Sequence, residues 1–263
     1  MIWRIVQASS TGTSHIEHGE VCQDEYFAGV FDTPGGEAYF LGLVSDGAGS
    51  ASHGGRGASI VCEAGSVVIE QLVREVVSLS GLTSEAVTSW VVAIRQRICQ
   101  AAEAEGLASR DFACTLLGAV IGTNTAAFFQ VGDGAIVIGD GDSFAPVFWP
   151  ETGEYANMTY FVTDEDALAH LRVEISLSPP DEVAMFSDGL QRLALVYESR
   201  TAYTPFFEPM FSVLRKADLA ACGTLSDQLA RFLSSPKVNE RTDDDKTLVL
   251  AARRYDREAQ RQA

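Results

Sequence analysis

Three aspartates occupy the same local setting, in which an apolar run ends in a small residue that is followed by Asp-Gly. The segments are LGLVSDG at Asp46, FFQVGDG at Asp133 and VAMFSDG at Asp188. A single Asp-Gly pair is a common turn, because glycine accepts a positive φ. Three copies, each directly after an apolar run, predict carboxylates at the ends of rigid strands, where residues distant in sequence can converge.

Two further acidic segments accompany these three, namely CQDEYF at Asp24 and TDDDKTLVL at residues 243–245. Taken singly, each is typical of a solvated charge cluster. If the carboxylates do converge, they repel one another unless a cation lies among them.

The chemistry of these side chains favours a hard cation. Oxygen ligands select Mg²⁺ or Mn²⁺, whereas zinc prefers His and Cys. The chain has only four histidines, which disfavours zinc. Gly47, directly after Asp46, lacks a Cβ, so its carbonyl can approach an ion closely. Two such ions about 4 Å apart can clamp a phosphate and make hydroxide available near neutral pH.

Strands are expected to position these aspartates. Short, β-branched or aromatic segments bounded by Gly, Asp or Pro predict strands over 3–8, 38–44, 112–121, 126–131, 135–138, 173–177, 183–186 and 248–251. Residues 122–124 join two of these segments and have the length and composition of a hairpin turn, which predicts antiparallel pairing.

Helices separate the strands. Apolar residues at three- and four-residue steps predict helices over 61–76 and 86–98, the second capped by Thr83 and ended by Gly106. A further helical group includes residues 225–233 and stops before Pro236. This order lacks regular strand-helix alternation, so we expect an α+β fold of antiparallel sheets stacked as a sandwich with helices outside.

The length of 263 residues suits one domain, which we assign to residues 1–254. Residues 139–170 are rich in Gly, Pro, acids and aromatics and predict an irregular surface excursion, and residues 255–263 form a polar tail. Five scattered cysteines without a CxxC pair indicate reduced, structural thiols.

Acidic residues outnumber basic ones by 36 to 19, giving a net charge of −17. This balance disfavours nucleic acid and anionic membranes as partners. We find neither a signal-peptide pattern nor a spanning apolar segment, and therefore expect a cytoplasmic protein. Signatures of serine hydrolases, HExxH metalloproteases and P-loops are also absent from the sequence.

The ordered motifs are identifiable as a set. They are QD at Asp24, SDGAGS at Asp46, ACTLL followed by VGDGA at Thr115 and Asp133, FSDG at Asp188, and DDKT at 244–247. Together they resemble the type 2C metal-dependent serine/threonine protein phosphatases, especially compact bacterial members with a GTSH element and a CQD motif. The resemblance covers residues 12–251.

This resemblance implies an α-β-β-α sandwich with a two-metal centre that removes phosphate from phosphoserine and phosphothreonine in proteins. Asp46 matches the aspartate that bridges both Mg²⁺ or Mn²⁺ ions, and Gly47 matches the glycine that supplies a carbonyl. Asp188 and Asp244 match ligands of the first ion, and Asp24 matches the residue that orders metal-bound water.

The resemblance extends to further features. Asp133 matches an aspartate that helps to bind a third ion, and residues 139–170 fall where the family has its flap. It also implies a phosphorylated protein substrate, a cognate serine/threonine kinase and, we expect, a monomer.

Departures from the family pattern affect the phosphate-binding half of the site. Gln23 replaces a common glutamate, Gly19 stands where relatives place a phosphate-binding arginine, and Ala48 replaces a histidine proposed as an acid. His15, His18 and Arg56 are the alternative phosphate-binding candidates, because each can donate hydrogen bonds to an anion. If they have no role in phosphate binding, the two histidines are exposed loop residues and the arginine lies at the start of a helix.

Two other functions stay open at this point. The chain could be a catalytically weak or inactive binding module that keeps the phosphatase fold, since Gln23 and Gly19 alter the site. It could also hydrolyse a small phosphorylated metabolite, because the motifs describe the reaction and not the leaving group.

Overall fold

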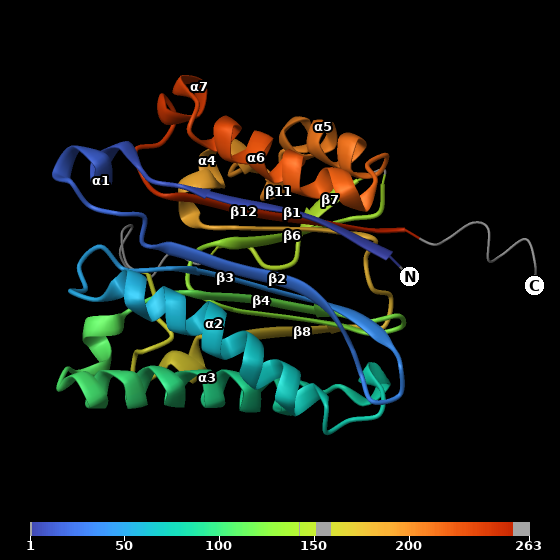
Figure 1. The fold of residues 1–263 in the computed structure, drawn as a ribbon, viewed down its shortest axis with the longest axis horizontal. Helices are drawn as coiled ribbons and strands as arrows, with labels where there is room; N and C mark the ends of the chain where they lie inside the picture. The colour runs from blue at the N-terminus through green and yellow to red at the C-terminus, as the bar shows by residue number, and fades with distance from the viewer. Residues whose placement is uncertain (1, 142, 151–158, 255–263) are drawn as a thin grey trace, which may run out of the picture.

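Two five-stranded antiparallel sheets pack face to face in the computed structural model, which describes residues 2–141, 143–150 and 159–254 (Figure 1). The first sheet has the order β1 (Ile2–Ser10), β12 (Lys246–Arg254), β9 (Glu182–Phe186), β6 (Ala135–Gly139) and β7 (Phe144–Pro146). The second has the order β2 (Asp24–Asp32), β3 (Ala38–Asp46), β4 (Leu116–Ile121), β5 (Ala126–Val131) and β8 (Arg172–Ser176). A separate hairpin joins β10 (Leu195–Val196) to β11 (Thr201–Ala202).

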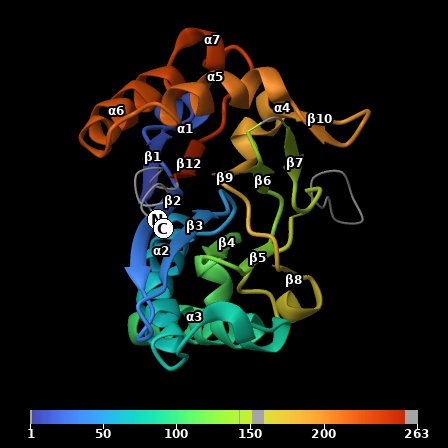
Figure 2. The same ribbon diagram turned by 90° about the vertical axis from the view of Figure 1, so that its right-hand side faces the viewer.

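Helices cover the outer faces of both sheets (Figure 2). The second sheet is covered by α2 (Gly54–Val73) and α3 (Ser84–Glu105), and the first by α4 (Gln191–Ala194), α5 (Thr204–Leu214), α6 (Cys222–Leu233) and α7 (Pro236–Asn239). The short helix α1 (Thr13–His18) lies at one end of the sandwich. Short 3₁₀ turns are η1 (Leu79–Gly81), η2 (Ser109–Phe112), η3 (Ala167–Ala169), η4 (Asp188–Leu190) and η5 (Leu219–Ala221). The predicted four-layer α+β sandwich is confirmed.

Burial on both faces explains why the central strands read as continuous apolar runs. In β3, Leu41 and Leu43 pack in the cluster under α2 and α3, whereas Phe40 and Val44 pack between the two sheets. Alternating side chains of one strand therefore contribute to two separate cores. None of the described helices is long and apolar enough to cross a membrane.

Several element boundaries lie where local sequence signals predicted them. The turn between β4 and β5 closes with a hydrogen bond from the Gly122 N–H to the Thr125 carbonyl at 2.9 Å. Thr83 caps α3 by accepting a hydrogen bond from the Ala86 N–H at 3.3 Å. Gly106 ends the same helix with a φ of 70°, in the left-handed region that glycine tolerates.

Other elements differ from the expectation. The strand predicted over 112–121 begins only at Leu116, because η2 precedes it. The strand β2 was not predicted, since it lies at the sheet edge and most of its side chains are partly exposed. The helix α5 was also missed, and it contains Pro209.

The described part of the excursion after β6 packs against the rest of the fold. It includes β7, and its later part returns to α3, where the Arg95 guanidinium donates to the Asp164 carbonyl at 2.7 Å. The Val162 N–H donates to the Cys114 carbonyl at 2.8 Å. Residues 151–158 of the predicted flap and the predicted tail 255–263 lie outside the described residues.

Candidate metal centre

The five predicted aspartates lie at strand ends on the side of the sandwich where α1 lies (Figure 1). Asp46 ends β3 and is paired in register with Asp24, the first residue of β2. Asp188 and Asp133 each follow a strand by two residues, and Asp244 precedes β12 by two. Because antiparallel neighbours run in opposite directions, the start of one strand lies beside the end of the next.

Burial and mutual repulsion raise the pKa values of these carboxyl groups. Burial raises the pKa of Asp24 to about 7, although hydrogen bonds from Ser187 and Thr247 oppose the shift. Burial, followed by the charges of Asp24 and Asp188, raises the pKa of Asp46 well above its ordinary value. These carboxylates therefore share one strongly negative, poorly hydrated region.

Asp188 completes this group. Burial raises its pKa to about 7, with further contributions from the charges of Asp133 and Asp244. The charge of Asp244 also raises the pKa of Asp24 and Asp46, which places it electrostatically within the same cluster although its side chain is exposed. By contrast, the neighbouring Asp243 is not among the main causes of these raised pKa values.

Asp24 is held by a buried hydrogen-bond chain. The Ser187 hydroxyl donates to Asp24 Oδ2 at 2.6 Å, and the Thr247 N–H donates to Ser187 Oγ at 3.1 Å. The Thr247 hydroxyl lies 2.5 Å from that of Ser9. These bonds fix one oxygen of Asp24 and leave the buried Oδ1 without a partner among the described residues.

The backbone around Asp46 is fixed from the neighbouring strand. The Asp46 N–H donates to Thr115 Oγ1 at 2.9 Å, and the Thr115 N–H donates to the Asp46 carbonyl at 2.8 Å. A Cβ at Gly47 would lie 2.3 Å from the carbonyl carbon of Gly54, so only glycine allows the first turn of α2 to pack here. The peptide after Asp46 is therefore rigid.

The donor set fits a hard divalent cation. Asp188 Oδ1, like Asp24 Oδ1, is buried without a partner in the described structure. Asp46 and Asp188 lie within side-chain hydrogen-bond reach, a pairing that requires a proton on one of them. A divalent ion would replace that proton and offset the repulsion. No three His, Cys, Asp or Glu side chains among the described residues already converge as a closed ligand shell.

Asp133 lies against the excursion. Its Oδ2 accepts a hydrogen bond from the Thr159 hydroxyl at 2.6 Å, and its carbonyl accepts one from the Gln191 side-chain amide. Burial raises the pKa of Asp133, although the Thr159 bond opposes that change. The excursion predicted to be a flap thus contacts the acidic cluster directly.

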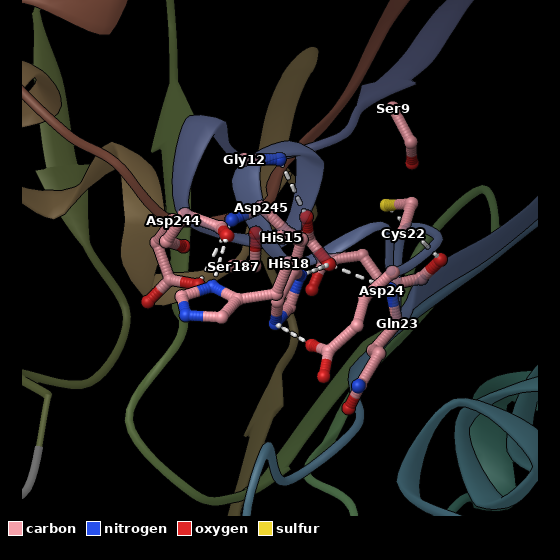
Figure 3. Close-up of polar contacts among 12 residues, drawn as sticks. Ser9, Gly12, His15, His18, Cys22, Gln23, Asp24, Ser187, Asp244 and Asp245 are labelled. Atoms are coloured by element: carbon pink, nitrogen blue, oxygen red, sulfur yellow. Dashed lines mark hydrogen bonds and ion pairs between the residues drawn. The ribbon is translucent and has the colours of Figure 1, made fainter.

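Asp245, which we did not select from the sequence, joins the two ends of the loop that carries α1 (Figure 3). Its Oδ1 accepts from the Gly12 N–H at 2.6 Å, and its Oδ2 accepts from the Gln23 N–H at 2.6 Å. The His15 ring nitrogen Nδ1 lies 2.9 Å from Oδ2. Asp245 is buried, whereas Asp244 points out. Asp244 lies at a bend, where its Oδ1 accepts a hydrogen bond from the Asp245 N–H at 2.8 Å, so no local pattern in the run 243–245 separates the two roles.

The three phosphate-binding candidates are placed differently. His15 faces carboxylates with both nitrogens, since Nε2 lies 3.6 Å from Glu20. Burial lowers the pKa of His15, but the hydrogen bond and charge of Asp245 outweigh this effect, so its pKa is raised. His18 is exposed and bonds the Ser14 carbonyl at 2.7 Å. Arg56 is exposed in the first turn of α2, next to the glycines that contact Gly47 and Gln23.

Two of the three departures from the family pattern, Gly19 and Gln23, lie at the two ends of the segment that follows α1. Gly19 ends α1 with a φ of 73°, a left-handed conformation that an arginine would adopt only with strain. Gln23 packs against Gly55 of α2, and its buried Oε1 has no partner among the described residues.

We expect the metal-free protein to become more stable as the pH falls from about 8 to about 6. The pKa of Asp24 and of Asp188 is raised to about 7, so each binds its proton more tightly when folded. The stability from these protons is complete below the unfolded pKa and is lost as the pH rises through about 7. Melting temperatures measured in EDTA across this pH range test the effect, and Asp24→Asn should make the melting temperature depend less on pH. Equal values at both pH extremes would contradict the raised pKa values.

The chain matches known proteins along nearly its whole length. The family model for protein phosphatase 2C matches residues 11–234. Serine/threonine-protein phosphatase 3 of Escherichia coli (strain K12) is 43% identical over 251 residues, covering 95% of this chain and 98% of that protein.

Solved structures share the fold. A serine/threonine phosphatase from Staphylococcus aureus matches with a TM-score of 0.64 at 15% identity, covering 97% of this chain and 96% of its own. The catalytic domain of the serine/threonine protein phosphatase PstP, in complex with two manganese ions, matches with a TM-score of 0.61 at 17% identity. That match covers 95% of this chain and 97% of the other.

Proposed function

The chain belongs to the protein phosphatase 2C family, and from this membership we propose that it removes phosphate from phosphoserine and phosphothreonine in proteins. The observation that carries the proposal is the cluster of buried and half-buried carboxylates at the ends of β2, β3 and β9, within a chain that is 43% identical to a serine/threonine phosphatase. The family assignment and the complete aspartate set do not favour an inactive binding module.

We assign the ligand roles as follows. Asp46 and the Gly47 carbonyl would hold the divalent ions together with Asp188 and Asp244, with Asp46 shared between the two ions. The raised pKa values of Asp46 and Asp188 support this assignment, because a cation relieves the repulsion that causes them. When bound, the ions make water nucleophilic at neutral pH and neutralise charge on the phosphate.

The protein's own residues orient the attack. Ser187 fixes Asp24 Oδ2, which leaves Oδ1 free to accept a hydrogen bond and then a proton from the attacking water. The Thr115 hydroxyl holds the peptide of Asp46, so this carboxylate keeps its direction during the reaction. Asp24 and Asp46 are neighbours across β2 and β3, and they therefore act on the same water.

Several finer assignments belong to the same proposal. We place a third ion near Asp133, whose bond to Thr159 ties it to the excursion after β6. We expect two Mg²⁺ or Mn²⁺ ions in the core site, a cognate serine/threonine kinase for the substrate, and a cytoplasmic monomer. Residues 1–254 are proposed as one catalytic domain, since the core between the two sheets draws on both ends of the chain, with Trp3 and Val249.

Purified protein tests the reaction directly. With Mn²⁺ or Mg²⁺ it should hydrolyse p-nitrophenyl phosphate, and EDTA should abolish the activity. Phosphoserine and phosphothreonine peptides should give a kcat/KM at least about tenfold above sugar phosphates and nucleoside monophosphates, because remote contacts strengthen transition-state binding. The reverse preference would identify a metabolite phosphatase.

Arg56 is our preferred phosphate-binding residue, because it is exposed in the first turn of α2, whose Gly54 packs against Gly47, while His15 is already engaged by Asp245. We expect Arg56→Ala to raise KM about tenfold and to lower kcat less, since a ground-state contact is lost. Arg74→Ala, at the other end of α2, serves as the control. An unchanged KM in Arg56→Ala would exclude the role.

A further inference from the structure

A concave surface lies in the helical layer outside the first sheet. It is enclosed by α4, α5, α6, α7 and the β10–β11 hairpin, has a volume of about 990 Å³, and none of the five aspartates lines it. Figures 1 and 2 show these elements together above β1 and β12. A volume near 1,000 Å³ is at the upper end of the range for small-molecule sites. We refer to this surface as the α5–α6 groove.

The α5–α6 groove is lined mainly by apolar side chains that have no covering layer. Tyr197, Tyr203, Val213 and Phe232 line it and remain 50%, 46%, 51% and 39% exposed, respectively. Large apolar side chains gathered in one concavity are typical of binding sites, whereas isolated ones are not. An apolar ligand would remove this surface from water.

The α5–α6 groove carries an excess of positive side chains, whereas the chain as a whole is strongly negative. Arg192, Lys237 and Arg241 line it with a single acid, Glu198, although the net charge of the protein is −17. Within the part of the chain that the structure describes, none of these three cationic side chains forms a hydrogen bond or ion pair. They come from α4 and the α7 region, which lie to the left of α5 in Figure 1.

We propose that the α5–α6 groove binds a small amphipathic anion, of the alkyl carboxylate class. Its apolar chain would pack against Val213 and Phe232, and its anionic head would pair with Arg192, Lys237 and Arg241. One cavity with apolar walls and a group of unpaired cations matches a ligand that carries one charge and one hydrocarbon body.

The wall of the α5–α6 groove is connected to the acidic cluster. The Tyr197 hydroxyl donates to the Gln191 side-chain carbonyl, and the Gln191 amide donates to the Asp133 carbonyl. Trp149 packs edge-on against Tyr197, with ring centroids 5.3 Å apart. A ligand that repositions Tyr197 therefore alters Asp133 through two hydrogen bonds. This coupling, unlike binding itself, rests on the proposed role of Asp133 in metal binding.

Calorimetric titration of the purified chain with dodecanoate, below its micelle concentration, tests the binding site. We expect one molecule per chain, with dodecyltrimethylammonium at least about tenfold weaker because its charge is reversed. Val213→Trp should fill the α5–α6 groove and lower dodecanoate affinity at least about tenfold, and Lys237→Glu with Arg241→Glu should do the same.

Matched variants control for general effects. Val67→Trp changes an equally exposed valine on α2, at 49% against 51%, and Arg231→Glu reverses an exposed charge on α6 that does not line the α5–α6 groove. Both should bind dodecanoate as the unchanged chain does. Absence of saturable binding, equal binding of the cationic amphiphile, or affinity that is insensitive to Val213→Trp would overturn the proposal. A dimer that Val213→Trp dissociates would instead make the α5–α6 groove an interface between copies.

Mn²⁺ titrations with and without dodecanoate test the coupling. The dissociation constant of the weakest Mn²⁺ site should change at least about threefold, and by linkage Mn²⁺ should change dodecanoate affinity by the same factor. Tyr197→Phe should keep dodecanoate binding and remove this change. Dodecanoate binding with unaltered Mn²⁺ affinity would overturn the coupling, whereas a chain that binds dodecanoate but no Mn²⁺ would overturn the proposed function.

Discussion

Asp46→Asn should lower kcat/KM at least about a hundredfold at saturating Mn²⁺, because one residue contacts both ions in the proposed centre. Its side chain is held on a rigid peptide by Thr115 and faces Asp24 across the strand pair. An amide is neutral and is a weaker ligand for a hard cation, so both ions lose affinity together.

The same variant separates a folding defect from a catalytic one. Burial and the charges of Asp24 and Asp188 raise the pKa of Asp46, so the metal-free protein carries unfavourable charge there. Without metal, Asp46→Asn should therefore melt no lower than the unchanged chain, while the stabilisation by Mn²⁺ should be lost. Asp32→Asn, an exposed change at the far end of β2, is the control. Full activity in Asp46→Asn would remove the proposed centre.

Asp188→Asn and Asp244→Asn should each reduce kcat/KM at least about tenfold and weaken Mn²⁺ binding, because both are assigned to the first ion. Both charges raise the pKa of Asp46, which shows that they act on the same region. Asp243→Asn is the matched control within the same acidic run. Its carbonyl accepts hydrogen bonds from Ser14, and its charge is not among the main causes of the raised pKa values of Asp24, Asp46 and Asp188.

Calorimetric Mn²⁺ titrations and steady-state kinetics measure these effects. Equal losses in Asp243→Asn and Asp244→Asn would mean that the ligand assignment in the run 243–245 is displaced by one residue. A loss in Asp244→Asn with normal Mn²⁺ affinity would assign Asp244 to substrate binding instead.

Local patterns in the sequence were sufficient for the layers of the fold. The apolar strands β3, β4, β5 and β9 are buried on both faces, so their runs were visible without knowledge of their neighbours. The Asp-Gly pairs marked three strand ends because a turn must follow each strand. The edge strand β2 was not predicted, because its half-exposed residues give only a weak pattern of apolar side chains.

The division of work between Asp244 and Asp245 required the tertiary structure. The residues alone gave three consecutive aspartates, and only the family resemblance selected Asp244. In the structure, Asp245 is turned inward, where it binds the backbone of Gly12 and Gln23. Both oxygens of this carboxylate accept hydrogen bonds from a loop that lies more than 200 residues earlier in the chain. No local sequence pattern reveals such contacts.

The sequence by itself determined the reaction class, since the types, order and strand-end positions of Asp24, Asp46, Asp133 and Asp188 are local properties. The tertiary structure decided which donors remain free. It turned His15 toward Asp245, left Arg56 exposed, and gathered Arg192 and Arg241 around an apolar groove. The physical reason is that a side chain's availability depends on the charges and surfaces that packing brings against it, and these come from distant parts of the chain.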